Sequence, residues 1–409
     1  MSALLPLVLL ACAPSDPSAE ARGPLSTAST DSGASTSDSG SEGTRPTADT
    51  GTPSTPPTTG GLTSERCEAM AFRPDGQFTF YETNPVLHDP ADHRGPYPTR
   101  SPSSIGLSDA LLQQATAELG TWGFVDSFIV FVDGAMVWEH YADGVAPEDS
   151  HNIHSASKSV LALATGIAFE QGHLAPDDTL EHWLPEYTEG LEQEKRDITV
   201  RQLLEMTGGF RWQEDHTEQV IEKEEDWVQA ILELPLHAPP GTWFNYNTGH
   251  THLLSAVLQR ATGQSTCDFV HESVFDPLGI QAEHWGRDPQ GVFSGGYNVY
   301  LTPRELARFG VLVEQQGVWE GQQLVSAAYV ADMLATHQHE PPYGYGLLWW
   351  TRELRGHPVQ IAWGYGGQFI YRVPDLGLMV VITTDTHDHD PWFFDAEYIV
   401  AGALIPALE

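Results

Sequence analysis

Positive charge is scarce in this chain of 409 residues. Its 19 Lys and Arg residues are outnumbered by 56 Asp and Glu residues, which gives a formal net charge of −37. Proteins that bind nucleic acid neutralise phosphates with cationic surfaces, so the sequence argues against a nucleic-acid partner. The acidic residues are spread through the chain, as expected for a solvated acidic surface.

A long apolar run is also missing. The N-terminal MSALLPLVLLACAPSD is apolar over a stretch too short to span a bilayer and typical of a secretory signal. Leu9-Leu10-Ala11-Cys12 resembles a bacterial lipobox with Cys12 as the lipidated residue, and Ala13 follows it. Residues 1–12 therefore predict a lipoprotein signal, membrane attachment through lipid, and export to the outer membrane, cell surface or periplasm. An ordinary signal peptide with an incidental cysteine is the alternative.

Residues 13–66 contain almost no large apolar side chains and are rich in Ser, Thr, Gly, Pro and Asp. Such a segment cannot bury a core, so it predicts a disordered tether ahead of a domain over 67–409. Cysteine is equally sparse, and besides Cys12 the chain has only Cys67 and Cys267. In an oxidising compartment these two can form a disulfide, although two free thiols are the alternative.

The order of expected elements indicates how the domain is built. Spacing predicts a helix over 106–120 and a hairpin over 127–144 around Asp133-Gly134. Mostly helical patterns run from 156 to about 285, and a Thr-Pro start predicts a helix over 302–317. Strand-like runs return over 359–385, before a closing helix over 391–406. The sheet must then be assembled from both ends of the chain, around an inserted helical domain in an α/β (α+β) fold.

The chain has only three lysines, and their surroundings differ. Lys195 and Lys223 lie in LEQEKRD and IEKEED, where solvated surface charges are expected. Lys158 instead opens the segment VLALATGIAF, which is apolar almost all the way round and predicts a buried helix. Ser155 lies three residues earlier, on the same face of that helix.

Ser155 and Lys158 suit nucleophilic catalysis. A serine hydroxyl is a weak nucleophile until a base removes its proton, and a lysine whose pKa is lowered by burial and the helix dipole can be that base. The Ser155 N–H, at a helix start, can also stabilise an oxyanion. A serine that caps the helix, followed by a lysine that extends to solvent, would have the same sequence. Other segments are therefore needed to distinguish this interpretation from a catalytic one.

Two other segments offer matching chemistry. Tyr246, in WFNYNTGH, precedes a helix and can relay a proton if it lies beside a lysine. Residues 364–368, Gly-Tyr-Gly-Gly-Gln, lie between strand-like runs, where glycines allow a substrate or another backbone to approach closely. An N–H of Gly367 or Gln368 can complete the oxyanion site. Taken singly, Tyr246 is more typical of packing, and the glycines suit a plain hairpin equally well.

In chain order, Ser155-Ala156-Ser157-Lys158, Tyr246-Asn247-Thr248 and the glycine-rich segment resemble the motifs of the serine β-lactamase and penicillin-binding-protein superfamily. The similarity is greatest to the class C β-lactamase-related serine hydrolases, which include esterases and 6-aminohexanoate-dimer hydrolase. It extends from about Pro98 to Asp385. The resemblance implies a β-lactamase/transpeptidase-like fold, with a mainly antiparallel sheet, flanking N- and C-terminal helices and an inserted all-helical domain.

The resemblance also implies catalysis by Ser155, Lys158 and Tyr246 through an acyl-enzyme, with no metal or other cofactor. The sequence departs from the family at Thr248, where Asn is usual, and at Gly364, where Lys or sometimes His is usual. That cation holds a substrate carboxylate in β-lactamases and peptidases, and Arg372, on the following strand, is the candidate to replace it.

We therefore expect hydrolysis of a small neutral ester or amide. The substrate-binding residues are expected to be Trp212, Thr248, Gly364, Tyr365, Gly366, Gly367 and Gln368. A β-lactamase or D-Ala-D-Ala carboxypeptidase is the alternative, as is a catalytically weak surface lipoprotein that binds peptidoglycan or a partner. The run His387-Asp388-His389 is expected to be a solvated loop, not a metal site.

Overall fold

The computed structural model describes residues 63–73, 98–214, 216–386, 394 and 396–409. Cys12, most of the predicted tether and His387-Asp388-His389 lie outside these residues. Residues 65 and 66, which the sequence analysis assigned to the tether, begin a helix that Ser64 caps by accepting a hydrogen bond from the Cys67 N–H. No helix in the described parts of the chain is both long and apolar enough to cross a membrane.

The helices are α1 (Glu65–Met70), α2 (Asp109–Gly120), α3 (Ser157–Glu170), α4 (Leu180–Trp183), α5 (Pro185–Thr188), α6 (Gln193–Arg196), α7 (Val200–Leu204), α8 (His216–Ile221), α9 (Trp227–Glu233), α10 (Thr248–Thr262), α11 (Thr266–Val270), α12 (Asp276–Leu278), α13 (Pro303–Glu314), α14 (Ala327–Leu334), α15 (Glu397–Ile399) and α16 (Ile405–Leu408). Short 3₁₀ or π turns occupy Pro102–Ile105, His154–Ala156, His271–Phe275, Pro374–Leu376 and Val400–Leu404.

The strands are β1 (Ala71–Phe72), β2 (Val125–Val132), β3 (Ala135–Tyr141), β4 (His151–Asn152), β5 (Trp285–Gly286), β6 (Tyr300–Leu301), β7 (Val318–Trp319), β8 (Gln322–Gln323), β9 (Gln338–Glu340), β10 (Tyr343–Tyr345), β11 (Trp350–Leu354), β12 (His357–Gly364), β13 (Gln368–Val373) and β14 (Leu378–Thr384).

One antiparallel sheet of eight strands organises the fold, in the order β3-β2-β14-β13-β12-β11-β10-β9. Strand β2 precedes the helical region and pairs with β14, which follows it, so the predicted assembly from both ends of the chain is confirmed. The predicted hairpin is confirmed as well, since β2 and β3 are joined by Asp133 and Gly134 at φ 49° and 72°. Positive φ at both positions is what a two-residue type I′ turn requires.

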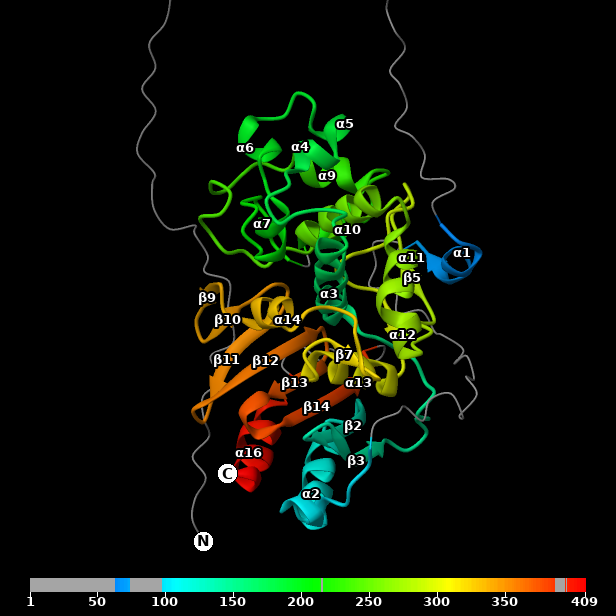
Figure 1. Cartoon of the computed structure of the whole chain (residues 1–409), viewed down its shortest axis with the longest axis vertical. Helices are drawn as coiled ribbons and strands as arrows, with labels where there is room; N and C mark the ends of the chain where they lie inside the picture. The colour runs from blue at the N-terminus through cyan, green and yellow to red at the C-terminus, as the bar shows by residue number, and fades with distance from the viewer. Residues whose placement is uncertain (1–62, 74–97, 215, 387–393, 395) are drawn as a thin grey trace, which may run out of the picture. The chain divides into compact units, whose positions relative to one another are not determined.

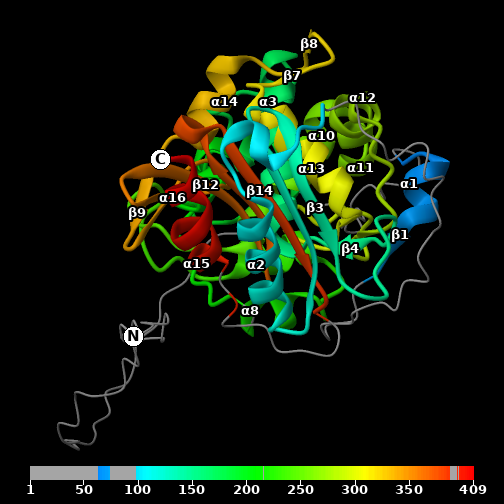
Figure 2. The ribbon, with the colours of Figure 1, turned by 90° about the horizontal axis from the view of Figure 1, so that it is seen from below.

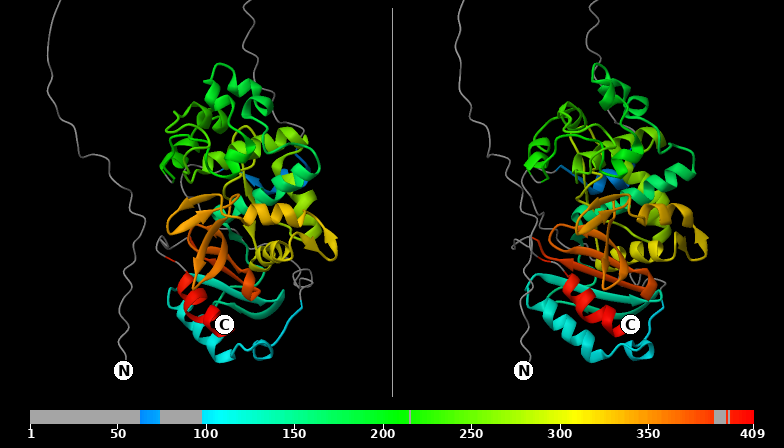
Figure 3. Two further views of the ribbon diagram at one scale, coloured as in Figure 1. Left: turned by 60° about the vertical axis from the view of Figure 1, so that its left-hand side comes forward. Right: turned by 90° about the vertical axis from the view of Figure 1, so that its left-hand side faces the viewer.

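Alternate residues of the central strands enter two separate cores. On β14, Val380 and Ile382 pack with α2 and the C-terminal helices, whereas Met379 and Val381 face the core around α3. The two-residue period of a strand accounts for this division. Figures 2 and 3 show α2 and α16 lying together against the same face of the sheet. The flanking terminal helices of the predicted fold are thereby confirmed.

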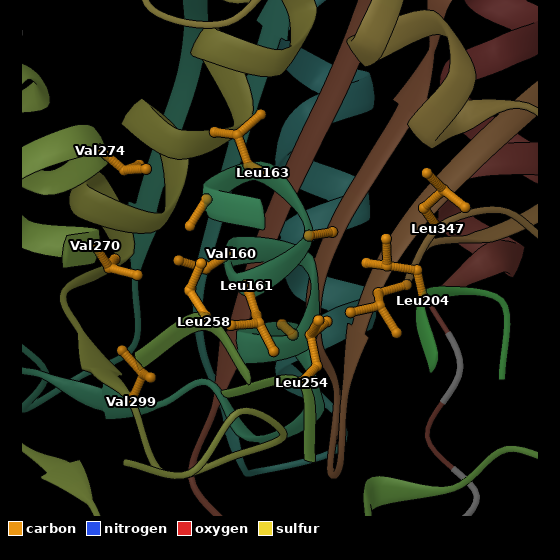
Figure 4. Packing of buried hydrophobic residues seen from close by; sticks show 14 of the residues in the cluster. Val160, Leu161, Leu163, Leu204, Leu254, Leu258, Val270, Val274, Val299 and Leu347 are labelled. Atoms are coloured by element: carbon orange, nitrogen blue, oxygen red, sulfur yellow. The ribbon is translucent and has the colours of Figure 1, made fainter. Parts of the chain in front are cut away.

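Helix α3 is the centre of the second core. The helices α4, α5, α6, α7, α9 and α10 lie around the end of α3 that is farther from the sheet (Figure 1). Figure 4 shows Val160, Leu161 and Leu163 of α3 surrounded by apolar side chains from other elements. The apolar pattern of the α3 sequence is thus confirmed as that of a buried helix, with residues 157–168 all buried.

The prediction of a solvated surface charge is confirmed for Lys223 and wrong for Lys195. Lys223 is exposed, but only 5 % of Lys195 is accessible, and its Nζ donates to the Leu232 carbonyl at 3.0 Å. The acidic surroundings of Lys195 in sequence suggested solvent. Its ammonium instead satisfies the last turn of α9, where a cation is also favoured by the helix dipole.

A disulfide joins Cys67 of α1 to Cys267 of α11 across 200 residues of chain. Ser64 and Arg66 add polar contacts at the same place, to Asp268 and Asp276 respectively. Closing so long a loop reduces the number of conformations open to the unfolded chain. Such a bond therefore typically stabilises the fold by about 2–4 kcal/mol. The start of the domain is thereby fixed to the helical region.

Helix α14 and strands β9, β10 and β11 were not among the elements expected from the sequence. The strands are short, and Gly344 and Gly346 interrupt their apolar pattern. A Cβ at Gly346 would lie 2.4 Å from the Met333 carbonyl oxygen, so close backbone packing explains this glycine. Contacts across the chain therefore define these elements more than local propensity does.

Candidate active site

Ser155 and Lys158 meet where the chain turns into α3. Ser155 lies in the 3₁₀ turn His154–Ala156 and is partly exposed, whereas Lys158 is 1 % exposed. The Lys158 Nζ lies 3.0 Å from the Ser155 Oγ. A nucleophile and its base need this separation for direct proton transfer, so the geometry suits an activated serine.

A second partner of Lys158 was missed from the sequence. The Gly296 carbonyl accepts a hydrogen bond from Nζ at 2.9 Å. Gly295 and Gly296 press against α10, where added Cβ atoms would lie 2.0 Å from the Thr251 oxygen and 2.6 Å from the Thr251 Oγ1. The double glycine in FSGGYNVY was the available signal, because adjacent glycines permit this close approach.

Tyr246 completes the group from the loop before α10. Its ring lies beneath the Lys158 ammonium, with 4.9 Å from Nζ to the ring centroid, and its hydroxyl hydrogen-bonds to Ser155. Burial, followed by the neighbouring Tyr345 and Glu214, raises the pKa of Tyr246 well above its usual value. The side chain is therefore a neutral phenol at physiological pH and can donate a proton. All three predicted catalytic residues come together.

The glycine-rich segment passes beside the same turn. A Cβ at Gly364 would lie 2.1 Å from the Ile153 carbonyl oxygen, and the Tyr365 ring lies edge-on to His154 at 5.4 Å. The close approach predicted for the glycines is thus present, and it is to the backbone just before Ser155. It also leaves no room for a lysine side chain at position 364 without movement of the backbone.

The remainder of this segment is used within the sheet. The Gly367 N–H donates to the Gly364 carbonyl at 3.1 Å, and Gly366 and Gly367 have φ of 80° and 108°. The Gln368 side chain is fully buried and its Nε2 donates to the Thr384 carbonyl at 2.9 Å. Gly366, Gly367 and the Gln368 side chain therefore shape the end of β12, β13 and β14.

Thr248 and Trp212 share one partner that the sequence analysis missed. The Glu214 carboxylate accepts from the Trp212 Nε1 at 2.5 Å, from the Thr248 N–H at 3.1 Å and from the Thr248 hydroxyl. Because Thr248 is the first residue of α10, Glu214 satisfies the start of that helix. Trp212 is 7 % exposed and packs beside Gly249. Glu214 therefore links both side chains to the start of α10, which follows Tyr246 in the chain.

Among the residues that the structure describes, Arg372 does not supply the replacement cation that the sequence suggested. Arg372 was the candidate, but it forms an ion pair with Glu314 and donates to the Gln360 side chain at 2.8 Å. It lies opposite Gln360, four residues and about 13 Å along β12 from Gly364. The suggestion that Arg372 reaches the site is therefore wrong.

His154 adjoins Ser155 and is also not a cation. Burial, and then the charge of Lys158, lowers the pKa of His154 to about 3. Its Nε2 lies 3.1 Å from the Thr386 hydroxyl, and its φ is 45°. A non-glycine residue in this left-handed conformation is strained, which tightens the turn that presents Ser155.

Solved structures with this fold are hydrolases and penicillin-binding proteins by their titles. A putative 6-aminohexanoate-dimer hydrolase from Bacillus anthracis matches with a TM-score of 0.62 and 20 % identity, over 71 % of this chain and 81 % of that one. A D-stereospecific amidohydrolase from Streptomyces matches with a TM-score of 0.60 and 20 % identity, over 73 % of this chain and 99 % of that one. These likenesses confirm the β-lactamase/transpeptidase-like fold.

Sequence comparison defines the family. The family model described as "Beta-lactamase" matches residues 109–404, so the chain belongs to the Beta-lactamase family. A 6-aminohexanoate-dimer hydrolase of Paenarthrobacter ureafaciens is 25 % identical over 295 residues, covering 65 % of this chain and 74 % of that protein. Penicillin-binding protein 4* of Bacillus subtilis is 25 % identical over 239 residues, covering 51 % of each. The predicted superfamily is confirmed, and the chain is hydrolase-like.

The packing at Gly296 generates a test of the lysine site. In Gly296→Ala the new Cβ would lie 2.7 Å from the Thr248 Cγ2 and 3.3 Å from the Lys158 Nζ, so the segment must shift. Loss of a charge-assisted hydrogen bond is worth about 1.5–3 kcal/mol, so turnover of an ester should fall roughly ten- to hundredfold.

The matched control is Gly120→Ala, since a Cβ at Gly120 meets nothing within 4 Å. It should retain the turnover of the parent protein. Equal kcat/KM values for the two alanine variants, measured on the same p-nitrophenyl ester, would contradict this account of Gly296.

Proposed function

We propose that the protein is a serine hydrolase that cleaves a small neutral ester or amide through an acyl-enzyme on Ser155. The carrying observation is the contact of 3.0 Å between the Lys158 Nζ and the Ser155 Oγ, beside the partly buried Tyr246. The names of relatives, 6-aminohexanoate-dimer hydrolase and D-stereospecific amidohydrolase, support cleavage of an amide. A solved structure titled EstCE1, with a TM-score of 0.58, is described as a hydrolase with promiscuous acyltransferase activity.

In the first step the Ser155 Oγ attacks the carbonyl carbon while Lys158, in its neutral amine form, takes the hydroxyl proton and becomes the ammonium that the Gly296 carbonyl and the Tyr246 ring stabilise. The bond from carbon to the leaving oxygen or nitrogen then breaks, and the Tyr246 phenol donates the proton that the leaving group needs. Lys158 returns a proton to Tyr246. We assign stabilisation of the oxyanion to the Ser155 N–H, at the turn into α3.

In the second step water attacks the acyl-enzyme and gives its proton to the Lys158–Tyr246 pair. The bond between the acyl carbon and the Ser155 Oγ breaks, the carboxylic acid leaves, and the proton returns to Oγ. Both steps use the same residues, so the cycle closes without a metal or other cofactor.

The charges around the site favour a neutral substrate. The position of the family cation is Gly364, His154 is neutral, and Arg372 is paired with Glu314. The negative charges of Glu214 and Glu218 both raise the pKa of Tyr246, so negative charge lies near the phenol. A substrate carboxylate would find little compensation here for its lost hydration, which costs several kcal/mol.

A comparison of two substrates on one preparation tests the proposal. We expect kcat/KM for a short p-nitrophenyl ester to exceed that for nitrocefin by about ten- to hundredfold, the value of one missing charge-assisted contact. Ser155→Ala is the blank and should lose both activities. Equal or faster nitrocefin hydrolysis would point to a β-lactamase and would overturn the preference for neutral substrates.

We also propose that the hydrolase domain is exported and anchored to a membrane by lipid on Cys12. Support comes from the sequence Leu9-Leu10-Ala11-Cys12 and the polar tract that follows it. Replacing Cys12 by Ser should move the protein from the membrane fraction to the soluble fraction of the producing bacterium, measured by fractionation and immunoblotting. Unchanged partition of Cys12→Ser would contradict the anchor.

A further inference from the structure

Two side chains, Lys158 and Trp350, contact the Tyr246 ring. The Lys158 ammonium lies over one face, 4.9 Å from the ring centroid. The Trp350 indole stacks on the ring with centroids 5.3 Å apart and planes at 24°. An ammonium and a stacked indole each favour the electron-rich face of a phenol, and such contacts are typically worth about 0.5–1.5 kcal/mol each.

Trp350 is itself fixed by the sheet. It begins β11, and its backbone pairs with Ile361 of β12 and Tyr345 of β10. Besides Tyr246, four aromatic rings pack around its indole, with centroid separations of 4.9 Å to Tyr345, 5.7 Å to Tyr343, 6.1 Å to Trp363 and 6.2 Å to Phe244. The indole therefore has little freedom to move away from Tyr246.

We propose that Trp350 is a positioning residue for catalysis, holding the Tyr246 ring against Lys158 and its hydroxyl on Ser155. Tyr246 lies in the loop before α10, whereas Trp350 belongs to the sheet, so the stack is a side-chain link between the two regions. This inference rests on the proposed function, because it assigns Trp350 a role only if Tyr246 transfers a proton.

The expected effect is on turnover and not on substrate binding. Without the indole, the phenol can tilt away from Ser155, and a misplacement of about 1 Å can cost roughly a hundredfold in rate. We expect Trp350→Leu to lower kcat for a p-nitrophenyl ester by about ten- to hundredfold, with KM within about threefold. Trp350→Phe keeps an aromatic face on Tyr246 and should retain most of the parent kcat.

The neighbouring tryptophan is a matched control. Trp349 is fully buried and stacks on Phe309, with centroids 6.3 Å apart and planes at 23°. Trp349→Leu therefore removes a tryptophan stack with a similar angle between the ring planes, but one that lies on a phenylalanine. It should lower the melting temperature at least as much as Trp350→Leu, while kcat of the folded protein remains within about threefold of the parent.

A double-mutant cycle with Tyr246→Phe separates the possible roles. If Trp350 acts through Tyr246, adding Trp350→Leu to Tyr246→Phe should change kcat by less than about threefold, because the hydroxyl to be positioned is already gone. A further loss as large as that in the parent background would overturn the inference. So would a rise in KM at constant kcat, which would assign Trp350 to substrate binding.

Failure of the proposed function has a different signature. Unchanged kcat in Tyr246→Phe alone would remove Tyr246 from the chemistry and overturn both the proposed mechanism and this inference. A large loss in Tyr246→Phe combined with an additive effect of Trp350→Leu would overturn the inference and leave the mechanism standing.

Discussion

The buried ammonium group of Lys158 sets the requirements that the surrounding structure meets. A cation removed from water is costly unless acceptors and favourable fields surround it. Lys158 finds the Ser155 hydroxyl just before α3, the Gly296 carbonyl between β5 and β6, and the ring of Tyr246 before α10. Three separate stretches of chain must converge for this. The packing of the helical region therefore also determines the geometry of the site.

Close packing against glycines serves that convergence. Gly295 and Gly296 bring one stretch onto α10, and Gly364 brings the end of β12 onto the Ile153 carbonyl. Glu214 holds the start of α10 through Thr248, and Trp350 supports the Tyr246 ring from the sheet. Each contact leaves little freedom at a reacting group, as electrostatic preorganisation requires.

The sequence predicted most of the fold because the relevant signals are local. Asp133-Gly134 specifies its turn, Thr302 caps α13 through a capping box, and the apolar α3 pattern indicates burial. Ser155, Lys158 and Tyr246 were predictable because their motifs are short and ordered along the chain. Glu214 and Gly296 were not, since their roles depend on contacts to residues 34 and 138 positions away. The prediction that Lys195 is exposed was wrong for the same reason, because the carbonyl that accepts from its Nζ belongs to α9.

The most direct test of the account is to identify the covalently modified residue. The protein would be treated with a fluorophosphonate probe, digested, and mapped by mass spectrometry, with Ser155→Ala and Lys158→Ala in parallel. The account predicts one modified peptide, with the adduct on Ser155, no labelling in Ser155→Ala, and much slower labelling in Lys158→Ala. Labelling of another residue, or equal labelling in Ser155→Ala, would contradict it.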